Sequence, residues 1–123
     1  MDTEVRILSP TEGDEIDFRG AIIRRKASRN ETGGHWAIGT GLQNAGFDNP
    51  RHVHDQAEAF YVLRGRYSFY TESREVEAGP GTFVLIPPGA VHGFRTEEDA
   101  SELLCVWPAD VERSFFGSRP SSF

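Results

Sequence analysis

The chain is poor in sulfur, with one cysteine and one methionine among its 123 residues. A single cysteine excludes an internal disulfide and a metal site built from several thiolates. Cys105 lies in the apolar run 103–107, so we expect it to be a buried core thiol. A lone cysteine is also typical of a reducing compartment, and we predict a cytoplasmic protein.

Long hydrophobic runs are absent and positive charge is scarce. No apolar run approaches the ~18 residues of a membrane-spanning helix, and residues 1–4 are acidic and lack the apolar segment of a signal peptide. For the same reason we expect no membrane partner.

Asp and Glu outnumber Lys and Arg by 19 to 13, which gives a net charge of -6. Because phosphate backbones repel an acidic chain, we expect no nucleic-acid partner. Residues 24–26 form a basic cluster, which we expect to be a solvated strand end.

The chain does contain many short segments rich in β-branched and aromatic residues, divided by glycine and proline. The clearest hairpin joins residues 59–63 to 67–71 through a turn at Gly65. Further strands are predicted at 5–8, 21–25, 35–42, 75–77, 82–86, 91–95 and 101–107. Turn residues at intervals of about ten residues predict an all-β fold, either a sandwich or a barrel.

The length suits a single domain covering residues 1–123. Its predicted parts are an N-terminal arm, a barrel and a C-terminal tail, at 1–20, about 21–107 and 108–123. Residues 43–50 are rich in Gly, Asn, Asp and Pro and are expected to form a loop. Residues 110–116 have a weak helical pattern, and residues 118–123 are expected to be disordered.

Three of the four histidines lie in two tight clusters. His52 and His54 are two residues apart, so in a strand both imidazoles point to one face. Glu58 shares their parity, and two imidazoles with a carboxylate suit a borderline divalent metal ion. His92 follows the rigid turn 87–89 and is the candidate for a fourth ligand.

The spacing of these residues resembles the two motifs of the cupin superfamily. Residues 46–65 fit the first motif, G-x5-H-x-H-x3-E-x6-G, and residues 81–92 fit the second, G-x5-P-x-G-x2-H. The short connection 66–80 is typical of compact single-domain microbial cupins. The second motif often ends with Asn four residues after its histidine, where this chain has Thr96. The segment 108–117 is similar to the C-terminal region of small quercetin-dioxygenase-like cupins.

This resemblance implies a jelly-roll β-barrel, the double-stranded β-helix, with one divalent transition metal inside its mouth. It implies that His52, His54, Glu58 and His92 are the metal ligands and that one or two coordination positions stay open. Three neutral imidazoles and one carboxylate leave such a site net positive, so it should attract an enolate, phenolate or carboxylate oxygen. The ligand set accepts Fe, Mn, Ni, Cu, Co or Zn.

Residues that share a face with the ligands are candidates for a cavity wall. If the strand parity continues, Phe60, Val62 and Phe94 point into the barrel, where they either line a substrate cavity or fill the core. Gln56 or Arg95 could support the ligands from outside.

The outward-facing residues bear on assembly. Tyr61 and Leu63 have the opposite parity and would face either the other sheet or a partner subunit. Small cupins commonly pair through their sheets, so the resemblance implies a homodimer, to which residues 1–8 could add an edge strand. His35, the remaining histidine, has no ligand-type neighbours and is expected to be structural or exposed.

The leading hypothesis is a metal-dependent enzyme that acts on an oxygen-rich small molecule, with quercetinase-like dioxygenation favoured by the resemblance. Glu58 is then the candidate catalytic residue, as a ligand or as the acceptor of a substrate proton. A non-redox isomerase, cyclase or decarboxylase that uses the metal as a Lewis acid is the alternative, and dependence of turnover on O₂ separates the two. A non-catalytic small-ligand-binding cupin is a third possibility, because cupin barrels also serve as sensing domains.

Overall fold

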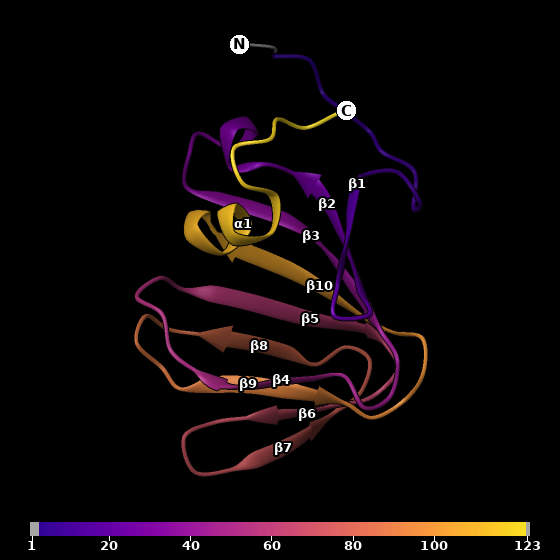
Figure 1. Ribbon diagram of the computed structural model, residues 1–123, viewed down its shortest axis with the longest axis vertical. Coiled ribbons are helices and arrows are strands. Elements are labelled where there is room, and N and C mark those ends of the chain that lie inside the picture. The colour runs from indigo at the N-terminus through magenta and orange to yellow at the C-terminus, as the bar shows by residue number, and fades with distance from the viewer. Residues whose placement is uncertain (1–2, 123) are drawn as a thin grey trace.

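The computed structural model describes residues 3–122, so the outermost residues of the predicted arm and tail, 1–2 and 123, lie outside the described part. Short strands make up most of the regular structure of the described chain, with a helix near its C-terminal end (Figure 1). In chain order the elements are β1 (Asp14–Phe18), β2 (Ala21–Ala27), the 3₁₀ helix η1 (Arg29–Glu31), β3 (Trp36–Gln43), β4 (Asp48–His52), β5 (Glu58–Arg64), β6 (Tyr67–Tyr70), β7 (Glu75–Ala78), β8 (Phe83–Ile86), β9 (His92–Thr96), β10 (Ser101–Pro108) and α1 (Ala109–Phe116).

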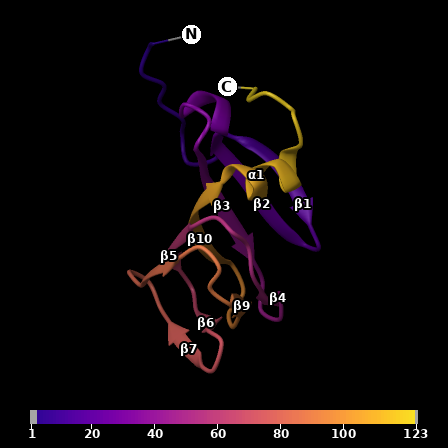
Figure 2. The same cartoon turned by 90° about the vertical axis from the view of Figure 1, so that its left-hand side faces the viewer.

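The strands form two antiparallel sheets. The order is β1-β2-β3-β10-β5-β8 in the six-stranded sheet and β4-β9-β6-β7 in the four-stranded sheet. Neighbours in both sheets are often far apart in the chain, as a jelly roll requires, so the predicted all-β jelly-roll barrel is confirmed. The hairpin predicted between residues 59–63 and 67–71 is wrong, because β5 and β6 belong to different sheets: β5 pairs with β8 and β10, and β6 pairs with β7 and β9. The N-terminal and C-terminal segments lie at one end of the molecule and β6 and β7 at the other (Figure 1, Figure 2).

The core lies between the two sheets, and on the longer strands of the six-stranded sheet alternate residues fill it. On β10, Leu103, Cys105 and Trp107 are buried, whereas the residues between them are partly exposed. Phe60 of the larger sheet meets Phe94 of the smaller one edge to face, with ring centroids 5.9 Å apart. Cys105 is the buried thiol expected from the sequence, and its burial raises its pKa well above the ordinary value.

The first strand lies later in the chain than predicted. Residues 5–8 form no strand, because no neighbouring strand pairs with them, and Val5 and Ile7 are 85% and 88% exposed. Instead β1, inside the predicted arm, forms a hairpin with β2. The two turn residues, Arg19 and Gly20, have φ angles of 52° and 91°, as the tight turns of two-residue hairpins require.

The predicted loop at 43–50 is also shorter than expected. Its last three residues belong to β4, which pairs with β9. β4 is an edge strand, so the missing N–H of Pro50 can face away from the sheet.

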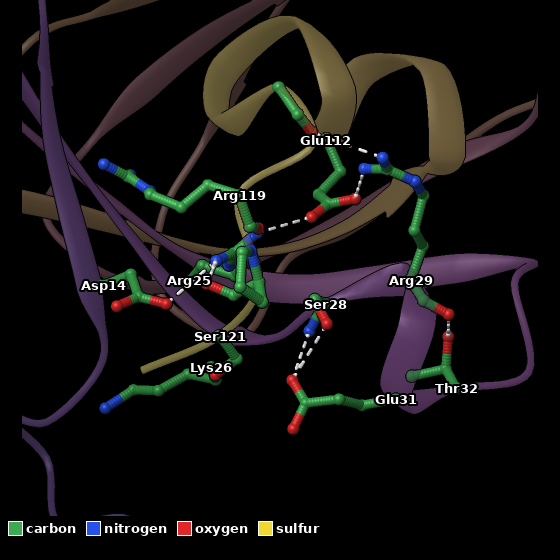
Figure 3. A network of polar contacts seen from close by, with 12 residues as sticks. Asp14, Arg25, Lys26, Ser28, Arg29, Glu31, Thr32, Glu112, Arg119 and Ser121 are labelled. Carbon is green, nitrogen blue, oxygen red and sulfur yellow. Dashed lines mark hydrogen bonds and ion pairs between the residues drawn. The ribbon is translucent and has the colours of Figure 1, made fainter. Parts of the chain in front are cut away.

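Arg25 contradicts the expectation that residues 24–26 form a solvated strand end. Strand parity places Arg25 on the same inward face as Ile23, and it is only 2% exposed. Its guanidinium lies 2.9 Å from Asp14 and 2.8 Å from Glu112 (Figure 3). A charge tolerates this degree of burial because it is paired on two sides.

The same guanidinium fixes the chain beyond α1. The helix confirms the one predicted in the tail, but the disorder predicted for 118–123 is wrong for the residues that follow it. The carbonyl oxygens of Arg119 and Pro120 each accept a hydrogen bond of 3.1 Å from Arg25. The N–H of Ser122 donates to a carboxylate of the same network at 3.1 Å.

We expect Glu112→Ala to destabilise the fold strongly, because it removes the carboxylate shared by the guanidinium groups of Arg25 and Arg29. Breaking a buried ion pair costs about 3–5 kcal/mol, so the free energy of unfolding of the variant should fall by about that amount. Urea unfolding measures it. Arg113→Ala is the matched control on the same helix, because it breaks only an exposed pair with Asp110. The control should lose less than about 1 kcal/mol, and equal losses in the two variants would contradict a buried network.

Candidate metal centre

Three histidines converge from β4, from the connection that follows it, and from β9. His52 ends β4 and His92 begins β9, and the two are paired across the strands with ring centroids 4.2 Å apart. His54 lies in the connection to β5, with its ring centroid 4.7 Å from that of His92. One nitrogen of each ring lies within 4.8 Å of the others, which is close enough for all three to reach one ion.

Each of these rings is oriented by a main-chain carbonyl two residues away. The Nδ1 atoms of His52, His54 and His92 lie 2.8, 2.6 and 2.8 Å from the carbonyl oxygens of residues 50, 56 and 90. A carbonyl oxygen can only accept, so each Nδ1 carries a proton and donates it. The lone pair of each neutral ring is therefore on Nε2, the tautomer that metal-binding histidines adopt.

The turn at 87–89 holds the second motif against the first. The N–H of Gly89 donates to the carbonyl oxygen of His54 at 2.8 Å. Gly89 has a φ of 79°, a conformation that glycine adopts without the strain of a side chain. This bond fixes the approach to β9, and with it His92, relative to the segment that carries His54.

Glu58, the first residue of β5, adds a carboxylate to the cluster. Its Oε1 lies 3.2 Å from Nε2 of His54 and 3.5 Å from Nε2 of His92, and the residue is 7% exposed. Burial lowers the pKa of His92, but the Glu58 carboxylate and the Ala90 carbonyl raise it by more, so the net direction is upward. The site therefore favours positive charge at this point.

Two observations indicate that these residues suit a divalent metal ion. Nε2 of His92 is buried and has no hydrogen-bond partner, which is costly unless something else satisfies its lone pair. With Nδ1 protonated, Nε2 of His54 and Oε1 of Glu58 are both electron-pair donors, yet they face each other at 3.2 Å. A cation shared between them removes that repulsion, and imidazole nitrogen with carboxylate oxygen suits a transition metal.

The cluster borders a cavity of about 370 Å³ between the sheets. Five phenylalanines line it together with Trp107: Phe18, Phe47, Phe60, Phe94 and Phe115. Phe60 and Phe94 are thus among the lining residues, whereas Val62 is wholly buried and is not. Strand parity correctly predicted that Val62 points inward, but it could not show that Val62 lies in the core beneath the cavity wall.

Residues 41–107 match the cupin domain family. The chain belongs to the cupin family. Both motifs, at 46–65 and 81–92, lie inside the matched range, so the features that suggested the family are also those that build the histidine cluster.

Relatives of this cupin include proteins with different activities. The quercetin 2,3-dioxygenase of Bacillus subtilis (strain 168) is 25% identical over 111 residues, which are 89% of this chain and 33% of that protein. The chain thus spans about a third of the length of that relative. The polyketide cyclase RemF from Streptomyces resistomycificus has a TM-score of 0.75 at 22% identity, covering 86% of this chain and 80% of its own. A predicted oxalate decarboxylase from Thermotoga maritima has a TM-score of 0.73 at 18% identity. The match covers 82% of this chain and 96% of that protein's chain.

The surroundings of the cluster differ in part from the expectation. Gln56 supports His54, but through its main-chain carbonyl, while its side chain accepts a hydrogen bond from the N–H of Asp110. Arg95 lies apart from the cluster, where it contacts Tyr70 and two glutamates. Sequence reasoning missed Gln43 among the lining residues, because no motif marks the end of β3. Among residues 3–122, no helix combines the length and apolar composition needed to cross a bilayer.

We expect His52→Ala and His54→Ala each to abolish stoichiometric metal binding while the barrel still folds, because each removes one oriented nitrogen from the cluster. Metal content is measured by plasma mass spectrometry after reconstitution and dialysis, and folding by circular dichroism. His35→Ala is the control, since His35 is exposed and outside the cluster. One equivalent of metal retained in both cluster variants would refute the ligand assignment.

Proposed function

We propose that this cupin is a metal-dependent enzyme that acts on an oxygen-rich small molecule, with dioxygenation as the favoured reaction. The observation that carries the proposal is the set of three imidazoles, oriented for metal binding beside a buried carboxylate and open to an aromatic cavity. Preoriented ligands at the edge of an apolar cavity are typical of a site for chemistry on a bound molecule.

In this proposal His52, His54, Glu58 and His92 hold one divalent ion, which is Fe, Mn, Ni, Cu, Co or Zn. When bound, such an ion supplies a Lewis acid and, if it is redox-active, a means of using O₂.

The residues of the chain position the substrate and handle its proton. The phenylalanine walls exclude water and suit the face of a flat aromatic molecule. Exclusion of water strengthens the attraction between the site and an anionic substrate oxygen. Glu58 borders the same cavity and can accept the proton that a substrate hydroxyl loses on binding.

Dioxygenation is favoured because the similarity to a quercetin 2,3-dioxygenase covers 89% of this chain. The alternative is a non-redox cyclase, isomerase or decarboxylase. It draws support from the shared fold of the polyketide cyclase and the predicted oxalate decarboxylase. A non-catalytic ligand-binding role remains the third candidate, and tight binding without turnover would favour it.

The test begins with elemental analysis of protein purified without chelators or a metal-affinity column. We expect about one equivalent of a redox-active metal, and O₂ uptake by the metal-loaded protein when quercetin is added. Glu58→Gln should keep most of the metal on its three histidines but slow uptake by about 10²- to 10⁴-fold, the usual contribution of a general base. Turnover of substrate without O₂, or stoichiometric zinc in the purified protein, would instead favour the non-redox alternative.

We further propose that the protein is a homodimer that pairs through the outer face of the six-stranded sheet. Tyr61, Leu63, Phe83 and Leu85 lie on adjoining strands β5 and β8 and are 42%, 42%, 61% and 61% exposed. Such a grouping of large apolar side chains is typical of an interface. Residues 3–8 form no strand within the single chain, so in this proposal an edge strand from this segment would form only on pairing with the partner.

Phe83→Glu combined with Leu85→Glu should convert the dimer to a monomer, because like charges would be buried without partners. Sedimentation velocity at micromolar concentration measures the mass. Val76→Glu is the control, since Val76 is similarly exposed, at 43%, but lies on β7 of the other sheet. A wild-type monomer would refute the dimer, and a dimer that survives the double substitution would refute this face.

A further inference from the structure

The side-chain amide of Gln43 is buried, and its NH₂ group has no hydrogen-bond partner among residues 3–122. It ends β3, is 4% exposed and lines the cavity. Its Oε1 accepts a hydrogen bond of 2.5 Å from the hydroxyl of Tyr67. Within residues 3–122, no group accepts a hydrogen bond from its Nε2.

Tyr67 fixes which way the amide faces. Tyr67 is completely buried, and burial raises its pKa, so the phenol keeps its proton and needs an acceptor. The reversed amide would leave this O–H unpaired in the core, which is costly. Oε1 therefore faces Tyr67, and the NH₂ group is the half left for another partner.

The position of Gly41 shows where the NH₂ group lies. Gly41 and Gln43 are two residues apart on β3, share its inner face and both line the cavity. A Cβ atom on Gly41 would be 2.7 Å from Nε2 of Gln43. The amide nitrogen thus occupies the space above Gly41 that a side chain would otherwise fill.

The sheet register separates this amide from the histidine cluster. Gly41 pairs with Leu103, which pairs with Val62 on β5. Val62 is four residues beyond Glu58, which is roughly 13 Å along the strand at about 3.3 Å per residue. The step from β3 across β10 to β5 adds about 10 Å at right angles, so the two polar points are about 13–16 Å apart. Phenylalanine rings line the same cavity as both polar points.

We propose that Gln43 is a specificity-determining residue that donates a hydrogen bond to a neutral oxygen of the substrate. This rests on the proposed function, in which an anionic substrate oxygen faces the histidines. The substrate class is then a flat molecule with an anionic oxygen at one end and a carbonyl or ether oxygen at the other. Allowing about 3 Å for each polar contact, these oxygens are on the order of 7–10 Å apart, about the length of two fused rings.

A buried donor selects its partner because a ligand without an acceptor leaves the donor unpaired. The test uses two probes: an acetylnaphthoate with its carboxylate and acetyl groups at opposite ends of the fused rings, and the isopropenylnaphthoate in which a methylene group replaces the acetyl oxygen. Calorimetry on the full chain should show about 3- to 10-fold tighter binding of the acetyl probe, the worth of one neutral hydrogen bond.

Two variants remove this preference in different ways. Gln43→Met combined with Tyr67→Phe deletes both hydrogen-bonding groups at similar volume and should bring the ratio of the two affinities to about one. Gly41→Ala places a methyl group against the amide and should lower the ratio with Gln43 intact. Tyr67→Phe alone keeps the donor and should retain part of the preference.

Equal binding of the two probes by the wild type would overturn the proposal, as would an unchanged preference in the double variant. Each titration is repeated with and without zinc. The zinc dependence of affinity for both probes tests the metal site, whereas the ratio between probes tests Gln43, so the two proposals fail separately.

Discussion

The geometry of the histidine cluster depends on hydrogen bonds between each imidazole and a main-chain carbonyl two residues away. These bonds commit the Nδ1 protons to the backbone and leave the Nε2 lone pairs available to a ligand. Because the carbonyls belong to the segments that carry the rings, the orientation is set as soon as those segments fold. The bond from Gly89 to the His54 carbonyl then joins the two segments, so the cluster is organised by the backbone before any ligand arrives.

The sequence indicated the residues of this cluster because two short local motifs contain them. The parity argument does not hold for all of them: His52 and Glu58 lie in strands, but His54 lies in the connection between those strands, where the Gln56 carbonyl orients its ring. The all-β fold class was also predictable from local signals, since glycine and proline mark the turns, whereas the jelly-roll topology was implied by the resemblance to cupins.

The burial of Arg25 was not predictable in this way. Asp14 lies opposite it in the β1–β2 hairpin, whose first strand the sequence did not indicate, and Glu112 comes from the other end of the chain, so no local pattern shows that both surround it. The strand expected at residues 5–8 failed for the converse reason: its composition suits a strand, but the fold provides no neighbour for it. Val62 shows the limit of parity, which distinguishes inward from outward but not a cavity wall from the core beneath it.

β10 has a consequence for how the chain folds. Among residues 3–122 it is the last strand in sequence, yet it lies inside the six-stranded sheet and is there the only described link between β1-β2-β3 and β5-β8. During synthesis on the ribosome, β3 and β5 therefore expose unpaired edges until β10 has emerged. Pairings over such long sequence separations make a transition state slow to reach, with folding on a timescale of about milliseconds to seconds. The nascent chain thus carries its metal-ligand residues well before it can complete the sheet that supports them, and this interval is when it is most exposed to aggregation.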